Sequence, residues 1–73
     1  MEPTQFTLND KSEFIELIKL LKIQGLAQTG GHAKILIEEG LVHVNGELEF
    51  RKRRKLRPGD TVEIEGNAVQ IAE

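Results

Sequence analysis

Six basic side chains lie close together in the segment 51–57, which reads RKRRKLR. This basic segment holds all four arginines of a 73-residue chain whose net charge is −2 at pH 7. The rest of the chain has four lysines against twelve acids, so a local charge of +6 stands on a background of −8. Screening over about 8–10 Å at physiological salt lets the local charge dominate at contact. The guanidinium fork matches phosphate oxygens, so the segment predicts a phosphate-binding site.

The sequence alone leaves three further roles open for the basic segment. Charged residues protect exposed sheet edges, although one or two lysines suffice for that purpose. A nuclear import signal has a similar composition and would require a eukaryotic host. A basic loop could also dock on an acidic protein surface, which would make the chain a protein-interaction adaptor.

The remaining residues that could do chemistry do not combine into a catalytic or metal site. The chain has no cysteine, which excludes a thiolate zinc site and a cysteine nucleophile. His32 and His43 have no partner at metal-ligand spacing, and the paired acids at 38–39, 47/49 and 63/65 are typical of solvated faces. We therefore expect no enzyme, no metal and no cofactor.

Length and composition favour a binding surface on one small domain, spanning 1–73. A chain of this size buries only about 60–65% of its unfolded surface, which leaves little room for a catalytic cleft. The first ten residues lack the features of a signal peptide, and no apolar run approaches the ~20 residues that cross a bilayer. We expect a cytoplasmic monomer without a membrane partner.

Two helices are predicted before the basic segment. A short strand at 5–8 precedes apolar residues at 14, 17, 18 and 21, which have helical spacing up to Gly25. The capping candidates of this first helix are Asn9, Asp10 and Ser12. The second helix is expected over 32–40, with Thr29 as a possible N-cap and Gly40 at a left-handed end. Its core-facing residues are Ala33, Leu36 and Ile37.

Beyond Gly40 the apolar period changes from 3.6 to 2, which predicts hairpins. We expect a three-residue loop around Asn45-Gly46 that pairs Val44 with Leu48 and Val42 with Phe50. A two-residue loop would instead mix acidic and apolar groups on one face. The second hairpin is expected to turn at Gly66-Asn67, and its pairs are Ile64 with Val69 and Val62 with Ile71. Pro58 and Gly59 suit the central positions of a type II turn.

These hairpins constrain the basic segment. If Leu48 and Phe50 point inward, the same alternation would drive Lys52 and Arg54 into the core, at a cost of several kcal/mol for each unpaired charge. We therefore expect 51–55 to leave the sheet and Leu56 to return to the core. All three phenylalanines are assigned to the core.

The stretches TGGHAKILIEEGLVHVNG and LRPGDTVEI resemble the RNA-binding domain first described in ribosomal small-subunit protein four, the S-four-type domain or alpha-L motif. The resemblance covers about residues 13–65 and is closest to small, free-standing bacterial members. It implies an α+β fold in which a helix-turn-helix hairpin packs on a small, curved, mostly antiparallel sheet of about four to five strands. It also implies binding to structured RNA, either ribosomal or transfer RNA, with ribosomal particles as further partners.

The resemblance implies an anion-binding face made from the start of the second helix and the basic segment. A helix N-terminus offers free N–H groups and partial positive charge to a phosphate. The family often has arginine at the positions of Gly30 and Lys34, and this departure shifts the burden onto 51–57. The predicted RNA-binding residues are Thr29, Gly30, Gly31, His32, Lys34, Arg51, Lys52, Arg53, Arg54, Lys55 and Arg57.

Overall fold

The structure is a computed structural model that describes residues 4–8 and 13–72. Asn9, Asp10 and Ser12, the expected caps of the first helix, lie outside the described residues. The helices are α1 (Leu17–Ile23) and α2 (Gly30–Glu38). The strands are β1 (Thr4–Thr7), β2 (Ile15–Glu16), β3 (Val42–Val44), β4 (Glu47–Leu48), β5 (Lys55–Leu56), β6 (Thr61–Ile64) and β7 (Asn67–Ala72).

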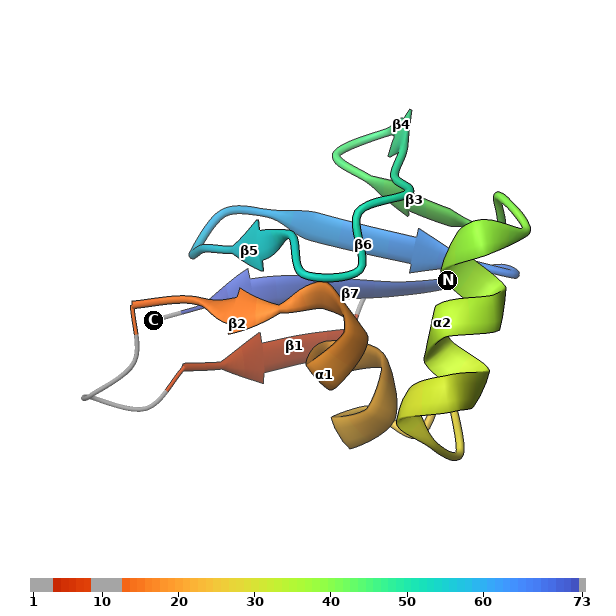
Figure 1. The fold of residues 1–73 in the computed structure, drawn as a ribbon. Helices are drawn as coiled ribbons and strands as arrows, with labels where there is room; N and C mark the ends of the chain where they lie inside the picture. Colours follow the sequence, from red (N-terminus) through yellow and green to blue (C-terminus); the bar gives the residue numbers. More distant parts are fainter. Residues whose placement is uncertain (1–3, 9–12, 73) are drawn as a thin grey trace.

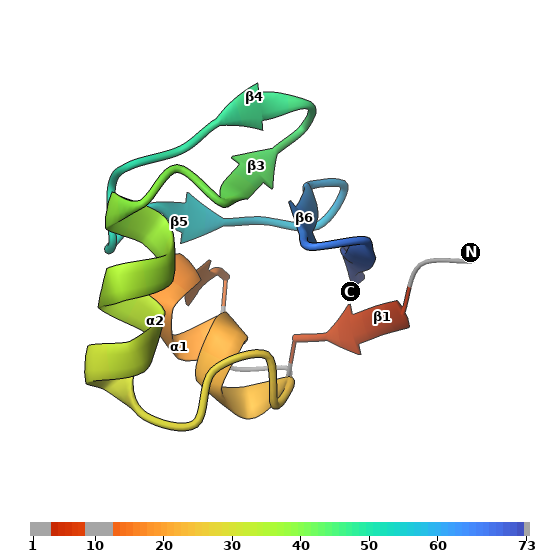
Figure 2. The same ribbon diagram turned by 90° about the vertical axis from the view of Figure 1, so that its right-hand side faces the viewer.

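The predicted fold class is confirmed. Five strands form a mixed sheet in the order β1-β7-β6-β3-β4, in which only β1 and β7 run parallel. In Figure 2 these strands form an arc around α1, and the two helices pack side by side within it. Figure 1 shows the small second sheet of β2 and β5 above α1 and β1. Neither helix within the described ranges is long and apolar enough to cross a membrane.

The core fills the space between the helical hairpin and the concave side of the arc. Side chains from both helices and from β3, β5, β6 and β7 meet there and form one continuous cluster. Its fully buried large residues are Leu17, Leu20, Leu21, Ile37, Leu56, Ile71, Val42, Val44 and Val62. Leu56 therefore returns to the core as the sequence predicts.

The predicted start of the first helix is wrong. Ile15 and Glu16 form β2, which pairs with β5, and α1 begins only at Leu17. Glu16 is the N-cap residue and makes no side-chain capping bond. The strand forms here because β5 offers its backbone as a partner, and this long-range pairing overrides the local helical spacing.

The predicted register of the first hairpin is also wrong. Val44 pairs with Glu47, and Asn45 and Gly46 form a two-residue loop with φ of +53° and +82°. Such positive angles at both central positions match the type I′ turn that Asn-Gly favours. Leu48 and Phe50 consequently point outward and are 47% and 56% exposed. The basic segment thus leaves the main sheet for a different reason from the one inferred, and Phe50 is not a core residue.

The second hairpin turns one residue earlier than predicted, which shifts the pairing of its two strands by two residues. Glu65 and Gly66 form its loop, both with positive φ, and Val62 pairs with Val69 rather than with Ile71. Because a shift of two residues keeps every side chain on its face, the predicted inward residues are still buried. The turn at 58–59 agrees with the prediction, since the Asp60 N–H donates to the Arg57 carbonyl at 3.0 Å and Gly59 has φ of +99°.

The second helix follows the prediction in its caps and its buried face. The Thr29 hydroxyl accepts a hydrogen bond from the His32 N–H at 3.0 Å, which makes Thr29 the N-cap. Ala33, Leu36 and Ile37 are buried. Gly40 lies just beyond the helix with φ of +75°. A side chain at Gly40 would have to adopt this left-handed conformation, which is strained for every residue with a Cβ.

Replacing Gly40 with valine is therefore expected to lower the free energy of unfolding by about 1–2 kcal/mol. Urea unfolding followed by circular dichroism measures the change. Gly31→Ala is the matched control, because Gly31 lies in the first turn of α2 and alanine favours a helix there. Equal stability of the Gly40→Val variant and the wild type would contradict the strain assigned to this position.

Candidate nucleic-acid interface

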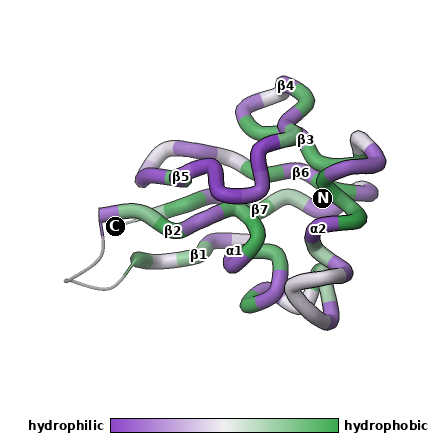
Figure 3. The backbone as a smooth tube through the Cα atoms, in the orientation of Figure 1, coloured by the Kyte–Doolittle hydropathy of each residue, from purple (hydrophilic) through white to green (hydrophobic). Residues whose placement is uncertain are grey.

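The basic segment is a loop anchored at several points. Its first residues, 51–54, belong to the connection from β4 to β5, the hydrophilic stretch between these strands in Figure 3, and its later part includes β5 itself. Its backbone turns at 52–53, and the Arg54 N–H donates to the Arg51 carbonyl at 3.3 Å. The Leu17 and Ile18 N–H groups, at the start of α1, donate to the carbonyls of Arg54 at 2.9 Å and Lys52 at 3.0 Å. The segment thus caps α1, and these donors are already used within the protein.

A buried carboxylate holds the beginning of this loop. Glu49 is 5% exposed, and within the described ranges it is the one buried charged residue. Its Oε2 accepts from the backbone N–H and Nε of Arg51, both at 3.0 Å. Its Oε1 accepts from Arg51 Nη2 at 3.0 Å and from Arg54 Nη1 at 2.8 Å. Two guanidinium groups therefore neutralise one buried acid.

These contacts change the titration of Glu49. Hydrogen bonds from the Arg51 side chain, followed by those from Arg54 and the Arg51 backbone, lower the pKa of Glu49 from 4.5 to about 2, and they outweigh the opposing effect of burial. The carboxylate therefore stays ionised at neutral pH. It was not among the predicted site residues, although an acid two and five residues before arginines was visible in the sequence.

Five of the six basic residues divide into a supporting and an exposed group, and Lys52, with 41% of its side chain exposed, approaches Glu38. Arg54 is 28% exposed in its side chain and faces Glu49, so it mainly supports the loop. Arg51 also binds Glu49 yet keeps 72% of its side chain exposed. Arg53, Lys55 and Arg57 are exposed. Because their side chains reach solvent, these last three, together with Arg51, are available to an external anion.

Four basic side chains of the segment line a hollow. An open concavity of about 620 Å³ is lined by Arg51, Arg53, Arg54 and Lys55. Lys55 Nζ also lies 5.0 Å and the Arg57 guanidinium carbon 5.8 Å from the centre of the half-buried Phe14 ring. Such cation–π contacts restrict the two side chains without using their hydrogen-bond donors. The arrangement can therefore hold phosphate oxygens at several points.

The start of α2 lies apart from this hollow. Lys52 Nζ approaches Glu38 Oε1 at 3.9 Å, which places the last turn of α2, and not its first, beside the basic segment. Figure 2 shows the connection from β4 to β5 passing this end of the helix. Nine helical residues span about 13 Å, so Thr29 stands roughly that far from the loop. The predicted site residues thus form two separate groups, one at the start of α2 and one in the basic segment.

Lys34 connects the two groups. It is exposed and lies four residues before Glu38, on the face of α2 that leads to Lys52. Gly30 lies on the same line one turn earlier and carries no side chain. At the helix start His32 accepts from the Gln28 N–H through Nδ1 at 3.1 Å, so this ring is held in place. The line from the basic segment to Lys34 therefore passes Glu38, whose carboxylate lies 3.9 Å from Lys52 Nζ.

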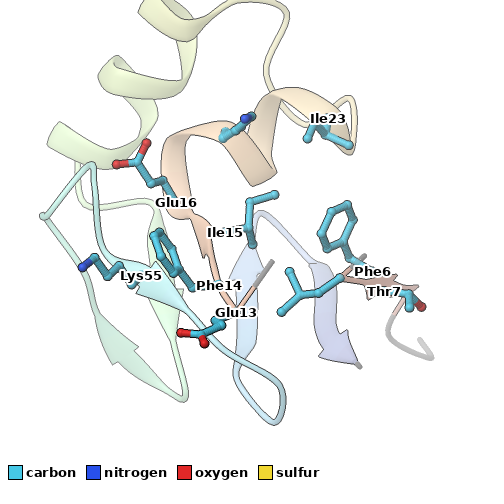
Figure 4. Close-up of a pocket in the computed structure, with 10 residues that line it drawn as sticks. Phe6, Thr7, Glu13, Phe14, Ile15, Glu16, Ile23 and Lys55 are labelled. Atoms are coloured by element: carbon cyan, nitrogen blue, oxygen red, sulfur yellow. The ribbon is translucent and has the colours of Figure 1, made fainter. Parts of the chain in front are cut away.

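A second hollow has a different character. A depression of about 750 Å³ lies between β1 and the β2–α1 unit, and Figure 4 shows the residues around it. Phe6, Leu8, Ile15 and Ile23 give it apolar walls, while charged side chains such as Glu13 stand at its rim. No group of three or more potential metal ligands occurs within the described ranges.

Comparison with known proteins decides the family. A family model described as S4 domain matches residues 6–72. The chain belongs to the S4 domain family. The S-four-type resemblance inferred from the motifs is thereby confirmed, and the match extends beyond the residues that carried it.

Relatives of this S4 domain come from distant bacteria. A protein of Escherichia coli (strain K12) named "Putative RNA-binding protein YbcJ" is 46% identical over 61 residues, which cover 84% of this chain and 87% of that protein. A protein of Bacillus subtilis (strain 168) named "Probable ribosome maturation protein RlbA" is 47% identical over 55 residues, which cover 75% and 78% of the two chains. The solution structure of E. coli YbcJ, described as revealing an alfaL motif involved in RNA-binding, superposes with a TM-score of 0.74 at 40% identity. It covers 100% of this chain and 91% of that one.

The Glu49 cluster predicts an acid-sensitive fold. A carboxylate whose pKa is lowered on folding adds stability that is complete above its unfolded pKa of 4.5 and is lost as the pH falls toward about 2. The expected loss between pH 5.5 and 2 is about 2–3 kcal/mol from this residue alone. Glu49→Gln should be less stable by a similar amount at pH 7, and its stability should depend less on pH over that range.

Urea unfolding at a series of pH values measures both effects. The matched control is Glu47→Gln, because Glu47 is an exposed acid two residues earlier in the chain. This control should keep the pH dependence of the wild type. If the free energy of unfolding of the Glu49→Gln variant depends on pH in the same way as that of the wild type, the cluster does not hold the loop.

Proposed function

We propose that this S4 domain is an RNA-binding module, not an enzyme, and that it grips structured RNA through phosphate contacts. The observation that carries the proposal is the concavity of about 620 Å³ lined by four basic side chains on an anchored loop. Cations held around a hollow favour a phosphate chain because each oxygen can accept a charge-assisted hydrogen bond. A loop fixed before binding also loses less conformational entropy when the RNA arrives.

The relatives support this proposal and narrow its ligand. The E. coli relative is named for RNA binding, and the B. subtilis relative is named for ribosome maturation. We therefore propose ribosomal RNA, in the cytoplasm and in or near ribosomal particles, as the first ligand to test. Transfer RNA is the second.

The number of phosphates that the protein can contact follows from how many of its basic side chains are exposed. Arg53, Lys55 and Arg57 point to solvent, and Arg51 adds an exposed guanidinium that is shared with Glu49. Lys34 and the start of α2 would extend the contact along the helix. Three to five neutralised phosphates correspond to a slope of log affinity against log salt of about −3 to −4.5.

Duplex DNA is the weaker alternative ligand. A helical hairpin that read the major groove would present α2 to the DNA. Lys34 is the one base in that helix, and Glu38 follows on the same face with Glu39 just beyond. These acids would repel the phosphates that border the groove.

Salt titration of binding to a structured ribosomal RNA fragment tests the proposal. The wild type should lose affinity steeply between about 50 and 200 mM salt. A triple Arg53→Ser, Lys55→Ser, Arg57→Ser variant should bind more weakly and show a slope shallower by about one per phosphate contact removed. Fluorescence anisotropy measures both quantities, and circular dichroism verifies that the variant is folded.

A control variant and a second polymer complete this experiment. Lys19→Ser with Lys22→Ser removes two exposed charges of α1 outside the basic segment and should leave the slope unchanged. Duplex DNA should bind more weakly than the RNA. A flat salt dependence of the wild type would refute phosphate binding. A partner protein that stays bound after nuclease treatment would favour the alternative function, an adaptor whose basic segment docks on an acidic surface of that partner.

A further inference from the structure

An exposed apolar patch lies beside the basic hollow. Leu48 and Phe50 both point outward, and a Cβ placed on Gly40 would lie 3.5 Å from Leu48 Cδ2 and 3.7 Å from Phe50 Cε1. The two side chains therefore meet over a residue that has no side chain of its own. We call Gly40, Leu48 and Phe50 the apolar patch. The next residue in the chain, Arg51, lines the hollow.

The backbone on either side of Phe50 is fixed. The Glu49 N–H donates to the Val42 carbonyl at 3.0 Å, and the Arg51 N–H donates to Glu49 Oε2 at 3.0 Å. The inward position of Glu49 forces its neighbours in the extended chain to point outward. The exposure of Phe50 is thus a consequence of the same cluster that positions Arg51 and Arg54.

The charges around the patch select what can cover it. On one side of the patch lie the exposed arginine and lysine side chains of the basic segment. On the other side α2 ends, where the helix dipole is negative and where Glu38 and Glu39 add carboxylates. Phosphate is attracted to the first side and repelled from the second. An uncharged, flat group attached to a bound phosphate is the part of a nucleic acid that this patch fits.

We propose that Phe50 stacks against an unpaired nucleobase of the bound RNA. The adjoining arginine and lysine side chains of the basic segment hold the phosphates next to that nucleotide. The inference rests on the proposed function and deepens it, because the ligand becomes a structured RNA with a bulged or looped base. Leu48 Cδ2 and the Phe50 ring atoms Cε1 and Cζ all lie within 3.8 Å of the position of an added Gly40 Cβ, so the two side chains stand side by side there. A base stacked on an aromatic side chain contributes about 1–3 kcal/mol, or about 5- to 150-fold in affinity.

The test pairs a protein variant with an RNA variant. The RNA is a hairpin with one bulged nucleotide, and its partner carries an abasic nucleotide at that position, so that the phosphates are identical. Phe50→Ala should lose at least about fivefold in affinity for the first RNA and little for the second. Phe50→Leu, which keeps apolar contact over Gly40 but lacks a flat face, should lose nearly as much. The salt slope should stay that of the wild type in both variants.

A direct reporter is available because the chain has no tryptophan. The indole of the Phe50→Trp variant should bind at least as well as phenylalanine, and its fluorescence should be quenched by the bulged RNA but not by the abasic one. Ile23→Ala is the matched control, since Ile23 is an equally exposed apolar residue at the far end of α1. It should leave both affinities unchanged.

The outcomes separate this inference from the proposed function. If the wild type binds RNA with a steep salt dependence and Phe50→Ala weakens both RNAs equally, stacking is wrong and phosphate binding stands. The same holds if the fluorescence of the Phe50→Trp variant responds equally to both RNAs. If the wild type binds neither RNA, the proposed function itself fails. If Phe50→Ala changes only the sedimentation of the free protein, the patch is an interface with a second copy of the chain, which also overturns the proposal.

Discussion

The buried carboxylate of Glu49 is the constraint on which the rest of this surface depends. Its two oxygens accept three hydrogen bonds from Arg51 and one from Arg54. Without those donors an ionised side chain could not remain in so small a core. The inward position of Glu49 then fixes the side-chain alternation of its strand and turns Leu48 and Phe50 outward. The Asn45-Gly46 turn and this ion cluster together fix the hairpin register and the surface that we propose contacts RNA.

The same loop supports the helical hairpin from which it projects. A seven-residue helix without a side-chain cap is not stable by itself, and α1 depends on carbonyls of Lys52 and Arg54 for its first N–H groups. Binding surface and fold are thus coupled through the backbone of the basic segment. Side chains that face inward build the loop, while the exposed ones are those that we propose contact RNA. A change to Arg54 would act on both.

Local chemistry was sufficient to predict one half of this structure. The second helix, with its Thr29 cap, buried face and Gly40 end, follows from spacing and turn preferences, as does the return of Leu56 to the core. The wrong predictions, of the first hairpin register and of the start of the first helix, both involve partners that local spacing does not reveal. The rule against burying charge led to the wrong hairpin register, because it ignored arginines that could neutralise Glu49. The β2 strand was missed because its partner lies about 40 residues away in the sequence.

The uneven charge along α2 limits the directions in which a phosphate chain bound to the basic segment can continue. Along the outer line of α2 the positions Gly30, Lys34 and Glu38 carry no charge, a positive charge and a negative charge. Glu38 is offset by Lys52, but the helix end remains unfavourable to phosphate. A phosphate chain held by the basic segment therefore meets a boundary at this helix end, between Glu38 and Gly40. The apolar patch lies on that boundary, where charge no longer favours the backbone and a base can make the contact instead.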